Sequence, residues 1–443
     1  MNGTDILLTI VHFLVTFLFG LGFLMTAATI LVYLERKTQA YMQDRYGPLH
    51  YGPAGILQSP FDVVKLLLKE DIRSFKQVDS TVFRLAPMIF FAPVITAFVA
   101  LPFSPYLTAS ALGTGIIYYV ALSSIDVIGV FMAGWGSNNK YALIGGLRSA
   151  AQMISYELPL VLSIVGAVML SSALAPGCAG SSANLASCGV GSISFTQIIA
   201  SQMQPGAPWF WFVLAQPLGL LVYYICGLAE TNRAPFDLPE AESELVAGYM
   251  TEYSGLRWAM FFLGEYGNMT IVSAVATALF LGGWSGPGAA IGFWQGIFGT
   301  TGGGGFVAGL IFNIIALFWF VLKMSVLLLV FMWVRATLPR LRADQLMRFA
   351  WLFLIPVTLI NILVTGVALL LPIGLVGQVL VSAVANWIML FLMIFAFRRL
   401  TGVSPLGKTP RWILRGSSSS VPGTGTAAPA KPALASPVVE AKP

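Results

Sequence analysis

The chain has 443 residues, of which 57% are hydrophobic and 9% are charged, and its mean hydropathy is +0.83. Soluble domains carry about 25% charged residues because their surface faces water, so a soluble globular enzyme is excluded. The net charge of +6 does not indicate nucleic-acid binding, because the basic residues do not cluster in a soluble module. Runs of about twenty apolar residues recur, and a bilayer accepts such runs as helices. We expect an all-α polytopic membrane protein.

The apolar runs predict about nine transmembrane helices, with charged connections on one side of the membrane only. The expected helices are 6–34, 83–103, 111–135, 156–175, 208–229, 257–284, 306–334, 349–371 and 374–397. Every Lys and Arg except Lys323 falls in or beside loops 35–82, 136–155, 230–256 and 335–348 or in the segment from residue 398, whereas the opposite loops contain neither. Basic loops are typically cytoplasmic. We therefore expect the N-terminus outside and the C-terminus in the cytoplasm, in a bacterial plasma membrane.

Two parts of the chain are predicted. Residues 1–398 form the transmembrane domain with its cytoplasmic loops, and residues 399–443 form a disordered Pro/Ala/Ser-rich cytoplasmic tail. Cys178 and Cys188 lie ten residues apart in the outer loop 176–207, where they either form a disulfide or remain two inert thiols. The sequence leaves both interpretations open.

One stretch in the first charged loop predicts an amphipathic helix. Within 54–70, four apolar residues recur at helical spacing, and the charged residues occupy the other face; the apolar set is Leu57, Phe61, Val64 and Leu68, and the charged set is Asp62, Lys65 and Lys69. With about 17 residues and several charges the segment is too short and too polar to cross a bilayer, so we expect it to lie in the membrane interface.

Charged residues within the expected spans are candidate functional groups, because ionisable side chains inside a membrane cost energy. Asp126 lies in the third span and Lys323 in the seventh. Asp126 either adds a protonatable site or pairs with Lys323 or with a base from a neighbouring subunit. Loop 230–256 holds six acids and one base, Arg233. Such a cluster favours proton handling over a plain solvated loop.

Familiar cofactor motifs are absent from the sequence. It has no Gly-x-Gly-x-x-Gly opening a βαβ unit, no P-loop and no Cys-x-x-Cys pair, its three cysteines are too few for a four-thiolate cluster, and its two histidines lie far apart. We therefore expect no metal, FMN, NAD or iron–sulfur site in this chain, so any redox electrons come from a partner protein.

Several segments resemble one known family. They are Glu35-Arg36-Lys37 with YMQDRYGP (41–48), PFDVVKLLLKE (60–70), GWGSNNKYALIGGLRSAAQMISYE (134–157), ETNRAPFDLPEAESELVAGYMTEY (230–253) and WVRATLPRLRADQLM (333–347). They resemble the quinone-cavity membrane subunit of respiratory complex I, the proton-pumping NADH:quinone oxidoreductase. The resemblance covers roughly residues 5–371.

This resemblance implies a role at the junction with the peripheral arm. The implied quinone-cavity residues are Arg36, Asp62, Lys65, Arg233, Asp237 and Arg335. The implied proton-relay carboxylates are Glu157, Glu230, Glu240, Glu242, Glu244, Glu252 and Glu265. The implied cofactor is a quinone, ubiquinone in preference to menaquinone, and the implied partners are other complex I subunits and membrane lipid. Neither set includes a catalytic residue for electron transfer.

The chain also departs from the family pattern. Its outer loop 176–207 is longer than usual, the ninth span and the tail lie beyond the common eight helices, and Asp126 stands where an apolar or small residue is expected. Two alternatives are a related membrane subunit of a hydrogenase or another quinone-linked dehydrogenase, and a secondary transporter. Transporters often show repeated halves with broken helices, and no such symmetry is found here.

Overall fold

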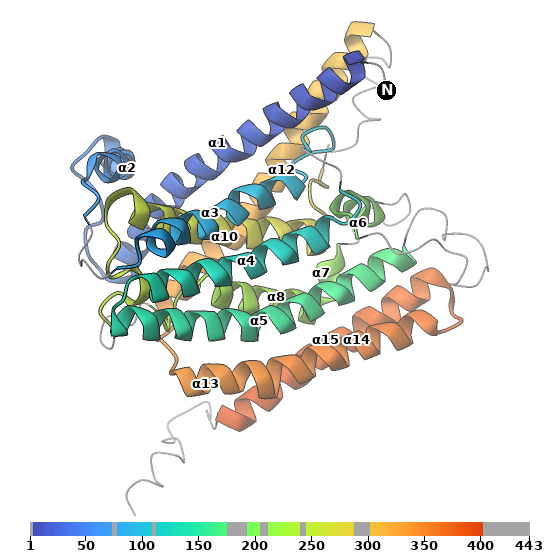
Figure 1. The fold of residues 1–443 in the computed structure, drawn as a ribbon. Helices are drawn as coiled ribbons and strands as arrows, with labels where there is room; N and C mark the ends of the chain where they lie inside the picture. The colour runs from blue at the N-terminus through green and yellow to red at the C-terminus, as the bar shows by residue number, and fades with distance from the viewer. Residues whose placement is uncertain are drawn as a thin grey trace, which may run out of the picture. The chain divides into compact units, whose positions relative to one another are not determined.

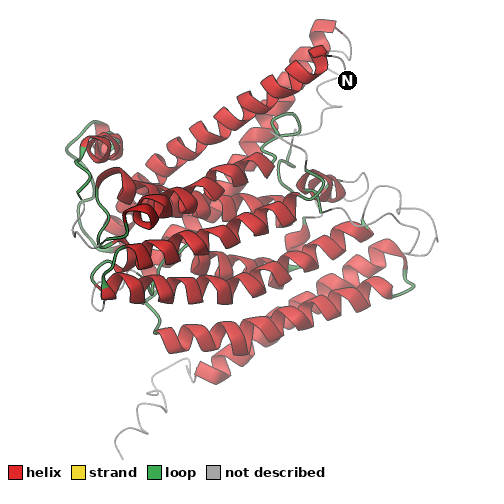
Figure 2. Cartoon of the chain, viewed as in Figure 1, coloured by secondary structure: helices red, strands yellow, loops and turns green. Residues whose placement is uncertain are grey.

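The computed structural model describes residues 3–72, 78–108, 112–174, 193–203, 211–239, 245–287 and 302–401. Within these residues all regular elements are helices (Figure 2). The long helices are α1 (Gly3–Met42), α3 (Ser80–Ala100), α4 (Gly115–Gly136), α5 (Lys140–Ala173), α8 (Pro217–Glu230), α10 (Gly255–Phe280), α12 (Gly302–Thr337), α14 (Ile355–Leu370) and α15 (Gly374–Thr401). The shorter ones are η1 (Pro53–Gly55), α2 (Gln58–Leu68), α6 (Phe195–Gln202), α7 (Phe212–Ala215), η2 (Gly248–Met250), α13 (Ala343–Arg348) and the π-helical η3 (Phe349–Leu354).

Seven helical segments of the described chain are long and apolar enough to cross a membrane. They lie in α1, α3, α4, α5, α12, the continuous α13–η3–α14 unit and α15. Of the other two expected spans, one corresponds to α8, which is apolar but only 14 residues long. The other corresponds to α10, which has 26 residues but carries both Arg257 and Glu265. The predicted fold class, an all-α polytopic membrane protein, is confirmed.

Within residues 1–391, helices α3, α4, α5, α8 and α10 pack side by side (Figure 1). Small residues permit this close approach, as is usual where helices pack in membranes. Phe90 of α3 illustrates it: a Cβ added at Gly129 would lie 2.8 Å from Phe90, and one added at Gly264 would lie 2.5 Å from its ring. Any larger side chain at either glycine would push α4 or α10 away from α3.

Some expected boundaries were wrong. Residues 136–155 were expected to form a loop, but α5 begins at Lys140 and is helical to Ala173. The Asn139 side chain accepts a hydrogen bond from the Tyr141 amide, which caps that helix at its N-terminus. Likewise α1 continues to Met42, so Glu35 and Arg36 lie on a helix. Charged side chains in a sequence suggest a loop. At Lys140 and at Glu35 and Arg36, however, the charged residues lie on the part of a membrane helix that extends beyond its apolar stretch.

The acidic loop after α8 is held against α5 by hydrogen bonds. Gln152 is fully buried, and its Nε2 donates to the carbonyl oxygens of Ala229 and Phe236 at 2.7 and 2.6 Å. Further along the loop, η2 packs closely on α5, since a Cβ at Gly145 would lie 2.7 Å from Gly248. Residues 230–239 and 245–254 are therefore packed segments and not a freely solvated loop.

Candidate functional site

Glu35 of α1 lies at the centre of a buried ionic network. Arg335 of α12 forms an ion pair with its Oε1, and Arg233, just after α8, approaches the same oxygen at 3.6 Å. The Tyr266 hydroxyl of α10 donates to the other oxygen at 2.6 Å. Glu35 is 5% exposed, so these donors replace the water that its charge would otherwise need.

Arg233 connects Glu35 to a second acid, Glu265. Its Nη2 lies 3.7 Å from Glu265 Oε2, and the Tyr249 hydroxyl donates to Glu265 Oε1 at 3.0 Å. The Arg233 guanidinium also lies 4.3 Å from the centre of the Tyr266 ring, a cation–π distance. Two acids and two arginines from four separate segments thus compensate each other's charge in a buried place. We call Glu35, Arg233, Glu265, Tyr266 and Arg335 the buried ionic network.

A more exposed ion pair joins α1 to the surface helix α2. Arg36 Nη1 lies 2.6 Å from Asp62 Oδ2, with side chains 44% and 30% exposed. Such a pair contributes little stability by itself, but it ties α2 to the end of α1. The apolar residues Phe61, Val64 and Leu68 of α2 are left exposed.

An apolar pocket of about 410 Å³ lies between α1, α2, α3 and α10. Most of its lining is aliphatic or aromatic, including Val32, Leu67, Phe91 and Trp258. Its polar lining residues are Thr29, Arg36, Ser59, Asp62 and Tyr266. Small-molecule sites combine a mainly apolar cavity with a few polar groups in this way. Tyr266 belongs to both the pocket and the buried ionic network, so the two are in direct contact.

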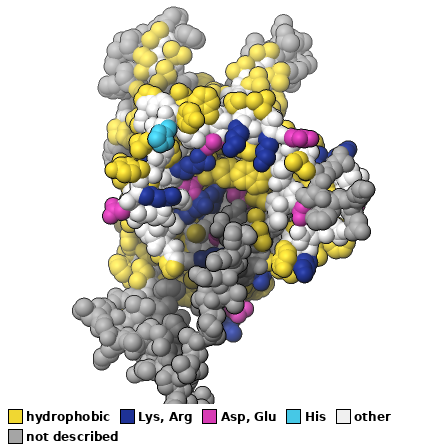
Figure 3. Space-filling view, turned by 90° about the vertical axis from the view of Figure 1, so that its left-hand side faces the viewer, with side chains coloured by type: hydrophobic (Ala, Val, Ile, Leu, Met, Phe, Trp, Pro, Cys, Tyr) yellow, Lys and Arg dark blue, Asp and Glu magenta, His cyan; other side chains and the backbone are white. Residues whose placement is uncertain are grey.

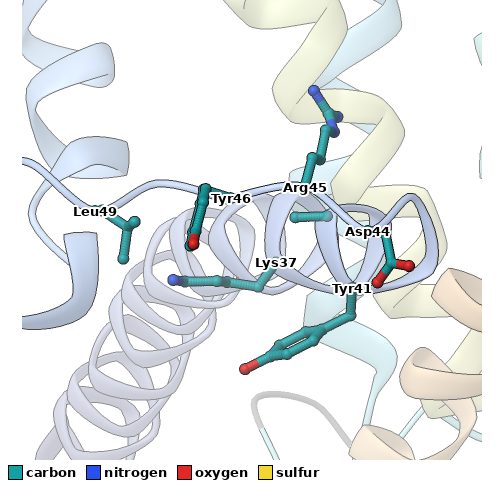
Figure 4. Close-up of a pocket in the computed structure, with 8 residues that line it drawn as sticks. Lys37, Tyr41, Asp44, Arg45, Tyr46 and Leu49 are labelled. Atoms are coloured by element: carbon teal, nitrogen blue, oxygen red, sulfur yellow. The ribbon is translucent and has the colours of Figure 1, made fainter.

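A second hollow is open and more polar (Figure 4). It has a volume of about 420 Å³ and is formed by the last turns of α1 and the chain that follows; its lining is Lys37, Ala40, Tyr41, Asp44, Arg45, Tyr46, Gly47 and Leu49. Tyr41 and Tyr46 are 82% and 92% exposed. Exposed aromatic rings beside basic side chains suit contact with another protein better than binding of a lipid tail.

The charged side chains gather at one end of the helices. Turning that end toward the viewer shows Lys and Arg side chains across the middle of the face, with acids among them and apolar side chains around them (Figure 3). Arg257 of α10 adds an ion pair with Asp71 at 2.7 Å, which fixes the chain after α2 against α10. This one-sided distribution agrees with the charged loops expected on one side of the membrane.

The expected relay carboxylates occupy several different environments. Glu157 is half-buried and accepts a hydrogen bond from Ser124, and Glu230, at the end of α8, is 7% exposed. Glu252 is 9% exposed and accepts from Asn139 Nδ2 at 2.8 Å. Glu240, Glu242 and Glu244 lie outside the described residues, as do Cys178, Cys188 and the tail from residue 402.

Next to Glu252, Tyr253 stacks on Phe83 with ring centres 4.1 Å apart, and its hydroxyl donates to the Phe83 carbonyl oxygen at 3.3 Å. Burial raises the pKa of the Tyr253 phenol, so it remains a neutral donor. This contact holds the end of the acidic loop against α3.

The expected cavity residues are distributed over the network and the pocket. Arg233 and Arg335 belong to the buried ionic network, and Arg36 and Asp62 line the pocket. Lys65 is exposed on α2, and Asp237 is half-buried near the start of the acidic loop.

Sequence reasoning did not assign a role to Glu35, Tyr249 or Tyr266. Glu35 carries one available signal, since it is an acid directly after an apolar stretch. The two tyrosines carry no signal, because only packing brings their hydroxyls to the acids.

The suggested pairing of Lys323 with a carboxylate was wrong. Its Nζ donates to the carbonyl oxygens of Leu281, Gly283 and Ser285 at 2.6, 3.0 and 2.5 Å. It also lies 4.3 Å from the centre of the Trp211 ring. The unpaired carbonyl groups after a helix C-terminus attract a cation. Lys323 therefore binds the backbone after α10 and not a carboxylate.

Fold and site together define a polytopic α-helical membrane protein in which a buried ionic network adjoins an apolar pocket. A family model described as NADH dehydrogenase matches residues 14–366. The H subunit of NADH-quinone oxidoreductase from Dehalococcoides mccartyi strain CBDB1 is 41% identical over 389 residues, 88% of this chain and 95% of that protein.

Two more relatives carry the same name. The one from Brevibacillus brevis is 45% identical over 359 residues, 81% of this chain and 94% of that protein. The one from Geobacillus kaustophilus is 43% identical over 355 residues, 79% of this chain and 93% of that protein. The chain belongs to the NADH dehydrogenase family. The resemblance stated above is therefore confirmed. Membership of this family contradicts the alternative that the chain is a secondary transporter.

Proposed function

We propose that this chain is a membrane-arm subunit of a proton-translocating NADH:quinone oxidoreductase, where it forms part of the quinone cavity and couples quinone reduction to proton translocation. The observation that carries the proposal is the double role of Tyr266, which lines the apolar pocket and donates to Glu35 in the buried ionic network. Electrons reach the quinone from cofactors of partner subunits, and this chain supplies binding groups and charge.

The pocket suits the tail region of a quinone. Its apolar lining accepts an isoprenoid chain, while Arg36, Asp62 and Ser59 supply polar groups. We include Lys65, Arg233, Asp237 and Arg335 in the proposed cavity, which partner subunits complete. We expect the quinone to be ubiquinone in preference to menaquinone, and mass spectrometry of lipid extracted from the purified complex distinguishes them.

Coupling follows from electrostatics between the quinone and buried acids. Reduction to the quinol takes up two protons and passes through negatively charged states. A negative charge formed near a carboxyl group favours its protonated form, so a row of acids can pass the perturbation onward. The proposed row is Glu265, Glu252, Glu244, Glu242, Glu240, Glu230 and Glu157. Proton transfer along it also requires water or hydroxyl groups between the acids, such as Ser124 beside Glu157.

The proposed partners are peripheral-arm subunits at the charged end and other membrane-arm subunits along the helices. The proposed orientation has the charged end in the cytoplasm, the N-terminus outside and the C-terminus inside a bacterial plasma membrane. We propose that the charged face in Figure 3 binds the peripheral arm. A hydrogenase-type assembly would contain nickel, whereas the proposed one contains FMN and iron–sulfur clusters in its other subunits, so cofactor analysis of the co-purified complex separates the two.

Photo-crosslinking of the intact complex with a quinone analogue tests the cavity. Label on 35–70 or 255–266 supports it, and label confined to other subunits contradicts it.

Glu157→Gln and Glu230→Gln test the coupling: both are expected to leave the complex assembled and to abolish quinone-dependent pumping. Glu70→Gln is the matched control, because Glu70 is an exposed acid after α2. Undiminished pumping in both variants would refute the relay.

A further inference from the structure

Asp126 is a buried acid in α4 that the proposed row does not include. It is 2% exposed. Its Oδ2 accepts a hydrogen bond from Asn268 Nδ2 of α10 at 2.7 Å, while its Oδ1 has no hydrogen-bond partner. Because Lys323 is bound to carbonyl groups elsewhere, this acid is not balanced by that base. A desolvated carboxylate with no counter-ion is costly, and such groups tend to hold a proton instead.

A small cavity connects Asp126 to Glu230 of α8. Both acids line it, together with the polar side chains of Tyr119, Ser123 and Asn268. Its volume is about 10 Å³, close to the lower limit for one water molecule. Glu230 Oε2 also has no hydrogen-bond partner. Each acid therefore has a buried oxygen without a partner, and both line a space of water size.

In the described part of the chain, no basic side chain lines this cavity. Among the described residues, neither acid forms an ion pair. The ionisable groups nearby are Tyr119 and Tyr223, whose hydroxyls lie 3.4 Å apart, together with Cys226 and Glu157. Every one of these groups is neutral or negative. Two carboxyl groups that share such a site cannot both ionise without a large energetic cost.

We propose that Asp126 and Glu230 form one proton-holding site, with Asp126 acting as an additional protonatable group of the relay. Asn268 fixes the orientation of the Asp126 carboxyl group, and a single water molecule in the cavity bridges the acids. When the site gains a proton, one carboxylate oxygen becomes a hydroxyl and the charge of the pair rises by one; release reverses this. The inference deepens the proposed function and rests on it.

Infrared difference spectroscopy of the whole reconstituted complex tests the proposal, with spectra recorded as quinone is reduced. The wild-type complex is expected to show a carbonyl-stretch change from a protonated carboxyl group. Asp126→Asn is expected to lose that change and to move fewer protons per quinone reduced. Thr358→Val is the matched control, because Thr358 is an equally buried polar residue of α14 whose hydroxyl bonds only within its own helix. An unaltered band and an unaltered proton yield in Asp126→Asn would overturn the inference.

A second measurement keeps the test decisive if Asp126→Asn fails to assemble. In the wild-type complex, ¹³C-labelled aspartate should shift the carboxyl band, and an unshifted band would overturn the proposal. Glu230→Gln separates this inference from the relay itself. If Glu230→Gln still pumps, the relay through Glu230 fails. If Glu230→Gln abolishes pumping while Asp126→Asn keeps the wild-type carboxyl band and the wild-type number of protons per quinone, the relay stands and only the proposed role of Asp126 is refuted.

Discussion

The Tyr266 hydroxyl donates a 2.6 Å hydrogen bond to Glu35, although 231 residues separate the two in the chain. One side of Tyr266 therefore lines the apolar pocket, and its hydroxyl orients an acid that is paired with two arginines. Only the Tyr266 side chain would then separate a molecule in the pocket from the charged groups of the buried ionic network.

Tyr266→Phe should impair quinone reduction while leaving the helices packed. The ring that contacts Arg233 is retained, but a hydrogen bond to a charged group, typically about 1.5–3 kcal/mol, is lost. We expect quinone-linked activity to fall by about tenfold or more, since 1.4 kcal/mol corresponds to a factor of ten. The measurement is NADH:quinone activity in membranes, relative to reduction of a water-soluble acceptor by the same complex. Tyr224→Phe is the control, because the Tyr224 hydroxyl bonds the Leu327 carbonyl oxygen elsewhere; an equal loss there would show a general packing effect.

Glu35→Gln should destabilise the complex more than a double variant does. Removing this acid leaves Arg335 and Arg233 with too little negative charge, and breaking a buried pair from one side costs about 3–5 kcal/mol. Combining Glu35→Gln with Arg335→Gln removes one charge of each sign and should recover part of that loss. The measurement is the fraction of complex that stays assembled after heating, compared for Glu35→Gln, Arg335→Gln and the double variant. Strictly additive losses would contradict direct coupling between Glu35 and Arg335.

Gln152→Leu should loosen the acidic loop from α5. The substitution leaves the Phe236 carbonyl group without its 2.6 Å donor, at about 1–3 kcal/mol for an unsatisfied group, and it removes the 2.7 Å side-chain donor of the Ala229 carbonyl group, which keeps a backbone donor in Asn232. Limited proteolysis of the purified complex should then cut residues 230–256 faster than in the wild type. Gln378→Leu in α15 serves as control, since its side chain bonds only the nearby Leu371 carbonyl oxygen. Equal cutting rates for wild type and Gln152→Leu would disprove the anchoring role.

Lys323→Met should reduce stability without uncoupling the assembled protein. Methionine fills a similar volume, but it cannot donate to the carbonyl groups of Leu281, Gly283 and Ser285. We expect less assembled complex and an unchanged number of protons pumped per quinone reduced by the complex that remains. Pumping assays normalised to assembled protein check this. A lower proton yield per quinone would place Lys323 in the relay after all.

Much of the membrane topology could be predicted because hydropathy and helix length are local properties of a chain. An apolar run of about twenty residues satisfies its backbone only as a helix, whatever its neighbours are. Element ends were less predictable, as at Lys140, where polar residues begin a long helix. The amphipathic pattern of α2 also predicted a surface helix but not its contacts, since Asp62 turns toward Arg36 and leaves Phe61 and Leu68 exposed.

From sequence alone follow the helical membrane class, the charged end of the helices and the family, because each depends on composition, periodicity or contiguous motifs. Only the tertiary structure decides which charges meet. Glu35, Arg233, Glu265 and Arg335 come from separate segments, and no local pattern encodes their distances. The same holds for Asp126, whose partner is Asn268 and not Lys323. Electrostatic pairing falls steeply with separation in space, and helix packing alone sets that separation.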